Sequence, residues 1–211
     1  MAFVEGRRPI DWAGVENSHR AVILAGAGIG KTHEMKSRAE EKLEADKAAF
    51  FIRIEDIDED FELSFEVGDD EAFEAWLSSP DDAWFYLDSI DEARLDDPRT
   101  FAKAIRQFAR KIRAAQHRAH IVISSRPYAW RSHTDYAMVQ KYLPYARQKT
   151  KVVETVDADE LTEEVLEHVE ETSEADGGLR VYVLNDLTET DIRAFAEARG
   201  VADADRLVED I

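Results

Sequence analysis

The stretch from Val22 to Met35 reads VILAGAGIGKTHEM, and it decides the fold of this chain. It opens with an apolar run of strand length over 21–25 and continues, from Lys31 onward, into residues that favour a helix. Three of the chain's nine glycines lie between the two parts. Glycine is costly to order unless the backbone needs a left-handed conformation or a close approach to a ligand. The pattern therefore predicts a strand, a glycine turn and a helix.

The spacing of this turn matches the phosphate-binding loop, except that Ala25 stands where the usual pattern has its first glycine. Backbone N–H groups at a helix N-terminus favour a polyphosphate. We expect the Lys31 ammonium to reach the β- and γ-phosphates of a nucleoside triphosphate, and the Thr32 hydroxyl to ligate Mg²⁺. A glycine turn of no function would leave this Lys-Thr pair unexplained. The residues expected to bind the nucleotide are Gly26, Ala27, Gly28, Ile29, Gly30, Lys31 and Thr32.

Composition limits the class of protein and its partners. The 211 residues suit one domain, and the lack of cysteine excludes disulfides, thiolate metal sites and cysteine nucleophiles. A net charge of −19 repels nucleic-acid phosphates, so no direct nucleic-acid binding is expected. No apolar run approaches the roughly 18 to 20 residues of a membrane span. The N-terminus is too polar for a secretory signal, and we expect a cytoplasmic protein with no membrane contact.

Four more apolar segments of strand length follow along the chain, separated by helical patterns. These segments cover 48–54, 83–88, 119–124 and 179–184. The clearest helix has an apolar stripe formed by Phe101, Ile105, Phe108 and Ile112. Because the strands are apolar without period-two alternation, we expect an α/β fold of the P-loop NTPase type, with a parallel five-stranded sheet and helices on both faces.

Two further motifs follow expected strands, at the carboxyl edge where ligands of such sheets bind. In YLDSIDEA, Asp88 is placed to hold the magnesium ion, and Asp91 and Glu92 are placed to orient or deprotonate the water that attacks the γ-phosphate. The alternative is that these last two acids only cap a loop. In ISSRP, Arg126 is placed to sense the γ-phosphate, although it could instead pair with one of the many carboxylates.

Together, the motifs AGAGIGKT, YLDSIDEA and ISSRP resemble those of the STAND class of signal-transducing P-loop NTPases, and within it the NACHT-like group. The run from Asp88 to Glu92 is similar to the group's variant, in which the magnesium aspartate is followed by a small residue and then two further acids. The stretch VYVLNDLTETDIRAFA resembles the passage into the family's helical lid. The resemblance implies binding of ATP or dATP with Mg²⁺, slow hydrolysis, a switch between closed and oligomeric states, and a bacterial antiviral-defence role.

The resemblance covers roughly 22–199 and suggests limits for the parts of the chain. We expect a lead-in segment over 1–20, an NTPase domain over 21–200, and a tail over 201–211 that starts a helical lid absent from the chain. Protein partners or self-oligomerisation would then act through regions outside this sequence. By the same resemblance, Trp12 and Val15 are candidates to touch the adenine ring.

Two other functions stay open at this point. A small-molecule phosphotransferase uses the same loop with a mobile basic lid, for which RPYAWR over 126–131 is a candidate, but the acid pair after Asp88 favours water as the nucleophile. The other is a nucleotide-binding interaction module without turnover. The acidic block over 154–176 is expected to be an amphipathic helix with a solvated face, in preference to a cation site or a surface for a basic partner. His117 and His120 lack a third ligand for zinc.

Overall fold

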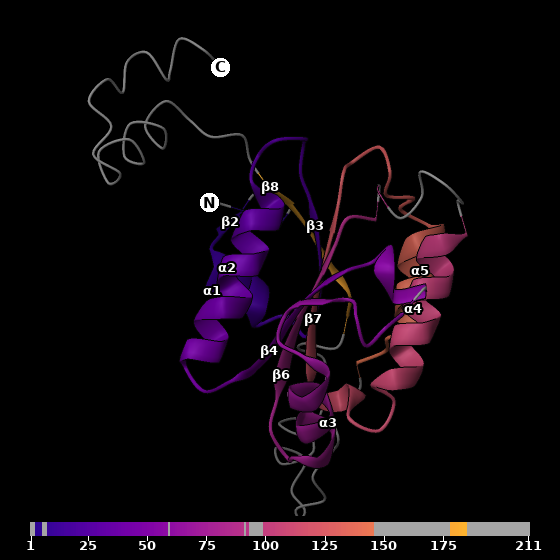
Figure 1. Cartoon of the computed structure of the whole chain (residues 1–211). Helices are drawn as coiled ribbons and strands as arrows, with labels where there is room; N and C mark the ends of the chain where they lie inside the picture. The colour runs from indigo at the N-terminus through magenta and orange to yellow at the C-terminus, as the bar shows by residue number, and fades with distance from the viewer. Residues whose placement is uncertain are drawn as a thin grey trace, which may run out of the picture.

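The computed structural model describes residues 3–5, 8–58, 60–90, 92, 99–145 and 178–184. An eight-stranded sheet runs through the molecule in the order β2-β1-β8-β3-β7-β6-β4-β5 (Figure 1). The strands are β1 (Phe3–Glu5), β2 (Arg8–Ile10), β3 (Arg20–Leu24), β4 (Ala48–Arg53), β5 (Phe65–Val67), β6 (Ala83–Asp88), β7 (Ala119–Ser125) and β8 (Arg180–Leu184). The helices are α1 (Trp12–Glu16), α2 (Lys31–Glu44), α3 (Asp70–Ser78), α4 (Thr100–Lys111) and α5 (Thr134–Tyr142).

The five strands that the apolar segments predict are neighbours in this sheet and run parallel, in the order β8, β3, β7, β6 and β4. The expectation of a purely parallel sheet is wrong, because β1 and β2 extend it antiparallel beyond β8, and β5 extends it antiparallel beyond β4. Each added strand has three residues, too few for hydrophobic periodicity to reveal. The segment over 1–20 thus contributes two strands and a helix to the fold.

Helices cover both faces of the sheet, as the sequence predicts (Figure 1). On one face α1 and α2 pack against the strands, with Met35 and Ala39 of α2 fully buried. On the other face lie α3, α4 and α5, and the apolar stripe of α4 is buried there. Leu43, in the last turn of α2, is 37% exposed and does not continue the buried face of that helix.

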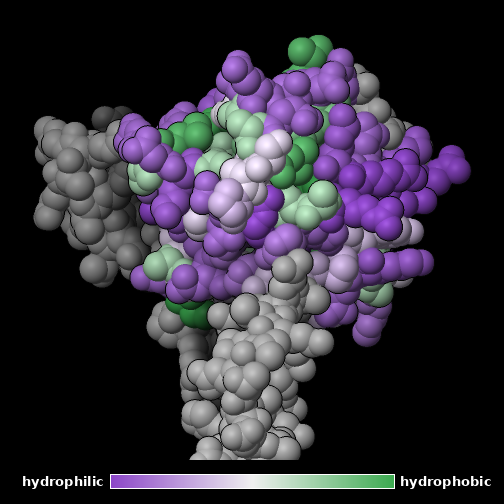
Figure 2. Space-filling model, turned by 90° about the horizontal axis from the view of Figure 1, so that it is seen from below, coloured by the Kyte–Doolittle hydropathy of each residue, from purple (hydrophilic) through white to green (hydrophobic). Residues whose placement is uncertain are grey.

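The carboxyl ends of the parallel strands meet at one edge of the sheet, at the top of Figure 1. Strand register brings Leu24 opposite Ser125, and Arg53 opposite Asp88. The opposite edge faces the viewer in Figure 2, where most of the described surface is hydrophilic and hydrophobic residues are dispersed among polar ones. The polar ends of β7, β6 and β4 therefore lie at the top, beside the end of β3 from which the glycine turn begins.

None of the helices in the described ranges is both long enough and apolar enough to cross a bilayer. Several expectations lie outside the described residues: Asp91, the acidic block over 154–176, the segment resembling the passage into a lid beyond Leu184, and the tail over 201–211.

Candidate functional site

The glycine turn joins β3 to α2 at the carboxyl edge of the sheet. Gly28 and Gly30 have φ angles of 74° and 87°, in the left-handed region that side chains disfavour. Gly30 directly precedes α2, and as a glycine it has no side chain that could cap the helix. The first-turn N–H groups of α2 therefore have no cap from that position, and an anion is a suitable acceptor for them.

Ala25 fits the place of the missing first glycine. Its backbone N–H donates to the carbonyl of Ser125 at 3.1 Å, which continues the pairing of β3 with β7. Its side chain is 2% exposed and belongs to the apolar cluster beneath α2. Its φ angle is not among the positive ones of the described residues. The position thus has neither the backbone conformation nor the exposure that would require glycine.

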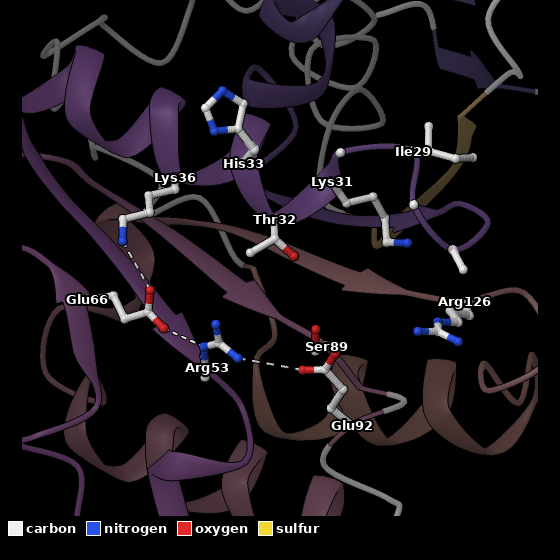
Figure 3. A pocket seen from close by; sticks show the side chains of 13 residues that line it. Ile29, Lys31, Thr32, His33, Lys36, Arg53, Glu66, Ser89, Glu92 and Arg126 are labelled. Atoms are coloured by element: carbon white, nitrogen blue, oxygen red, sulfur yellow. Dashed lines mark hydrogen bonds and ion pairs between the residues drawn. The ribbon is translucent and has the colours of Figure 1, made fainter. Parts of the chain in front are cut away.

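Lys31 is the first residue of α2, and its side chain folds back over the turn (Figure 3). Its Nζ donates to the carbonyl oxygens of Ala25 and Gly26, at 2.9 and 2.8 Å. The ammonium therefore lies over the concave side of the loop, held by backbone acceptors of the loop itself. A phosphate group is a stronger, charge-assisted acceptor than these carbonyls.

Asp88 connects the end of β6 to the glycine turn. Its carboxylate is 2% exposed, and Oδ2 accepts a hydrogen bond from Thr32 Oγ1 at 2.6 Å. The other oxygen, Oδ1, accepts from Ser124 Oγ, and that hydroxyl in turn accepts from the Ser89 N–H at 2.9 Å. Ser89 has a φ angle of 70°, a strained conformation for a non-glycine residue that this bond helps to hold. Three elements thus converge on one carboxylate.

The oxygens of Thr32 and Asp88 form a chemically suitable pair for Mg²⁺. Among the residues that the structure describes, no group of three or more His, Cys, Asp and Glu side chains forms a metal site by itself. Magnesium in nucleotide sites usually takes only one or two protein oxygens, and the remaining positions are filled by phosphates and water. The hydroxyl and carboxylate oxygens, 2.6 Å apart, fit that requirement.

A cavity of about 560 Å³ opens in front of these groups. Its walls combine the glycine turn and the start of α2 with polar side chains from the ends of β4, β6 and β7 (Figure 3). The lining residues are Ala27, Gly28, Ile29, Gly30, Lys31, Thr32, His33, Lys36, Arg53, Glu66, Ser89, Glu92 and Arg126. The structure therefore brings most of the site residues expected from sequence around one cavity.

The two expected groups on the γ-phosphate side, Arg126 and Glu92, lie on different parts of the cavity wall. Arg126 directly follows β7, and its Nη1 donates to the hydroxyl of the exposed Tyr128 at 3.2 Å. Glu92 Oε2 lies 3.8 Å from Arg53 Nη1. Asp91, the other expected acid, lies outside the described residues.

Sequence reasoning missed five lining residues: His33, Lys36, Arg53, Glu66 and Ser89. The most informative is Arg53, which ends the apolar strand β4 directly opposite Asp88. The sequence did contain a signal for Arg53, because a charged residue at the end of an apolar strand is the same feature that identified Asp88. Glu66 gave no comparable signal, because it lies in a short edge strand.

Three expectations about other residues do not agree with the structure. Trp12 and Val15 are buried in the apolar cluster beneath α1 and α2, and neither lines the cavity, so they are not placed to touch a base there. Trp130, in the segment considered as a mobile basic lid, is also buried. Its backbone N–H donates to the carbonyl of Arg126 at 3.2 Å. The segment is thus anchored by a tight turn and a buried ring.

His120 belongs to a stack of aromatic and histidine rings near the amino ends of the parallel strands. Its ring lies 4.2 Å from that of His19 and 4.9 Å from that of Trp84, measured between centroids. Burial lowers the pKa of His120, although a hydrogen bond to the Glu16 carbonyl and the nearby Asp82 act in the opposite direction. This environment explains the histidine without a metal.

Comparison with known proteins adds no assignment: no family model matches the chain, and no curated protein matches it. The functional argument therefore depends on the residues and the geometry of the cavity alone.

Proposed function

We propose that this chain binds ATP or dATP with Mg²⁺ and hydrolyses it slowly, as a switch module of the STAND and NACHT type. The observation that carries this proposal is the hydrogen bond between Thr32 and Asp88 beside a glycine turn closed by Lys31. Two chain segments far apart in the sequence supply these groups, and a nucleotide site needs both of them in one place. A glycine turn that served only to connect β3 with α2 would not require this convergence.

In this proposal each side chain has a distinct task. The loop N–H groups and the Lys31 ammonium bind the β- and γ-phosphates, while Thr32 and Asp88 hold the metal. The metal, when bound, neutralises charge on the phosphate oxygens. Glu92 orients the attacking water and accepts its proton as the bond between the γ-phosphorus and the β–γ bridging oxygen breaks. Arg126 donates to the γ-phosphate oxygens.

Two of the open alternatives have less support. A phosphotransferase would require a mobile lid, and the candidate segment is anchored by the buried Trp130. A binding module without turnover would need no proton acceptor beside the phosphates, whereas Glu92 lines the cavity. We further propose that the module acts in the cytoplasm, in bacterial antiviral defence, with protein partners or by self-association.

Binding and turnover on the purified chain test this proposal together. We expect a non-hydrolysable ATP analogue to bind only weakly without Mg²⁺ and more tightly with it, and we expect phosphate release from ATP at a slow rate. Glu92→Gln should retain nucleotide and slow phosphate release, because it removes a proton acceptor and leaves the phosphate ligands in place. If neither ATP nor dATP binds in the presence of Mg²⁺, the proposed function is wrong.

A further inference from the structure

The carboxyl edge holds a second pair of cations that the glycine turn does not include. Arg53 ends β4, and Lys36 lies on α2, one turn beyond Thr32. Both line the same cavity as Lys31 and Arg126, and Figure 3 shows them on the side away from Arg126. In a chain of net charge −19, four cationic side chains around one cavity indicate an anion site that extends beyond the loop.

Strand register places Arg53 beside the groups proposed to hold the metal. β4 and β6 run parallel, and Arg53 is the register partner of Asp88. Paired residues on neighbouring strands are about 5 Å apart and direct their side chains to the same face of the sheet. The Ile54 N–H donates to the Asp88 carbonyl at 3.0 Å, so this pairing persists to the ends of the strands. The guanidinium therefore lies within side-chain reach of a ligand bound at Thr32 and Asp88.

One side of the Arg53 guanidinium is held firmly, and the other is held weakly. Its Nε donates to Glu66, which also accepts from Lys36 Nζ at 3.1 Å. Its Nη1 lies 3.8 Å from a carboxylate oxygen of Glu92 and 3.8 Å from one of Glu55, beyond hydrogen-bonding distance. Arg53 and Glu92 are 37% and 39% exposed, and ion pairs of such exposure are weak. The Nη1 end can therefore change partners while Glu66 retains the Nε end.

We propose that Arg53 and Glu92 form a latch that the terminal phosphate of a nucleoside triphosphate opens. Without ligand, Arg53 Nη1 faces Glu92. With the triphosphate bound, the guanidinium donates to the terminal phosphate, and Glu92 turns to the water. This inference rests on the proposed function, since it concerns the same site.

The direction of this exchange follows from the strength of the two acceptors. A terminal phosphate carries more charge than a carboxylate and accepts two parallel N–H bonds from a guanidinium. The carboxylate of Glu92, at 3.8 Å, accepts no hydrogen bond from Arg53. A nucleoside diphosphate is one phosphate shorter and leaves the pair closed. The latch thus makes the carboxylate of Glu92 available only when a phosphate is present to be cleaved.

A double-mutant cycle on the full chain tests the latch through nucleotide affinity. The variants are Arg53→Met, Glu92→Gln and the double variant, titrated with ADP and with a non-hydrolysable ATP analogue, both with Mg²⁺. We expect Arg53→Met to weaken binding of the analogue about tenfold and binding of ADP less than about twofold. Glu92→Gln should tighten binding of the analogue by about two- to fivefold, but only where Arg53 is present, because the two residues are coupled.

Arg106→Met is the control, since Arg106 is exposed on α4, donates to a carbonyl of its own helix and is not among the residues that line the cavity. It should change either affinity by less than about twofold if the effect belongs to Arg53 and not to the overall charge of the chain. Arg53→Lys is a second variant that preserves the charge but lacks the planar fork, and it should recover only part of the lost affinity.

The outcomes separate the latch from the proposed function. Additive effects of Arg53→Met and Glu92→Gln, or equal losses for ADP and the triphosphate, would overturn the latch. If the unmodified chain binds triphosphate and Lys31→Ala abolishes that binding, the proposed function stands whatever the cycle shows. If the unmodified chain binds no nucleotide at all, both fail together.

Discussion

Arginine and lysine side chains serve different purposes at the amino and carboxyl ends of the parallel strands, which we call the amino edge and the carboxyl edge of the sheet. At the amino edge, Arg20 is 2% exposed and donates to five backbone carbonyl groups, which belong to three separate parts of the chain. At the carboxyl edge, Lys31 donates to two carbonyls of its own loop and lines a cavity. Burial lowers the pKa of Arg20 to about 10, so the group is still charged at neutral pH.

The aromatic and histidine rings of the amino edge also contact neighbouring side chains. His19 lies between His120 and Tyr145, with ring centroids 4.2 and 3.7 Å away, and Lys42 Nζ lies 4.7 Å from the centroid of Trp84. Arg20 and His19 at this edge therefore contact neighbouring groups of the chain, whereas Lys31, Arg53 and Arg126 at the carboxyl edge line a cavity. Charge alone thus does not identify a site, and the groups already bound to each charge must be considered as well.

The largest effect is expected at Arg20, where the comparison predicts loss of stability without loss of function. Arg20→Met would leave several buried carbonyls without a donor, at a cost of about 3 to 5 kcal/mol in the free energy of unfolding. Denaturant unfolding measures this cost. Arg106→Met is the control, because Arg106 is exposed and donates to a carbonyl of its own helix. Equal losses from both variants would remove the distinction between the two edges.

The next largest effect is expected at Arg126, on affinity and not on stability. A ligand shifts a two-state equilibrium only by its differential affinity for the states, so a switch requires contacts that differ between ATP and ADP. Arg126→Ala should weaken binding of a triphosphate analogue by about 1.5 to 3 kcal/mol, the scale of a charge-assisted hydrogen bond, and leave ADP affinity nearly unchanged. Isothermal titration with both nucleotides measures this. The same loss for both would place Arg126 on a shared phosphate or in the scaffold.

Asp88→Ala should affect only the part of the affinity that depends on magnesium. Because the carboxylate positions the Thr32 hydroxyl beside the proposed metal, its loss should weaken Mg²⁺-dependent binding by about 10- to 100-fold. Affinity in the presence of a chelator should hardly change. Titrating Mg²⁺ at fixed nucleotide concentration separates the two contributions, and an unchanged magnesium dependence would exclude Asp88 from the site.

The smallest effect is expected at His120, in the ring stack. Its pKa is lowered in the folded chain, first by burial, so the unfolded chain binds more protons below its pKa of about 6.5. The stability that the neutral His120 contributes to the folded chain is therefore present above a pH of about 6.5, and it is lost as the pH falls below that value. The free energy of unfolding of His120→Phe should depend less on pH between 7 and 5 than that of the unmodified chain. Parallel pH profiles would contradict this assignment.

The sequence predicted the parts of the fold that have strong local patterns. The five parallel strands are apolar over most of their length, and the helix stripe beginning at Phe101 repeats at the helical period, so both could be predicted without a structure. The antiparallel pairing of the short edge strands could not, because strands of three residues carry no periodicity that identifies a partner. Their pairing depends on tertiary contacts with β8 and β4.

For the site, the sequence predicted the residues that belong to compact motifs. Lys31, Thr32 and Asp88 follow from the glycine spacing and from the end of an apolar strand. The partners that set their geometry did not follow: the contact between Ser124 and Asp88 joins neighbouring strands, and Glu66 binds Arg53 and Lys36 from an edge strand. Which polar group meets which across strands depends on register, and register was not determined by composition or spacing.

Titration of the full chain with a fluorescent, non-hydrolysable ATP analogue, alongside Lys31→Ala, tests the central claim most directly. Lys31 lies at the loop surface, and its side chain contributes little to the core, so the variant should retain the unfolding midpoint of the unmodified chain. We expect saturable, Mg²⁺-enhanced binding to the unmodified chain and its loss, or great weakening, in the folded variant. Unchanged affinity in Lys31→Ala would contradict the assignment of the glycine turn as a phosphate-binding site.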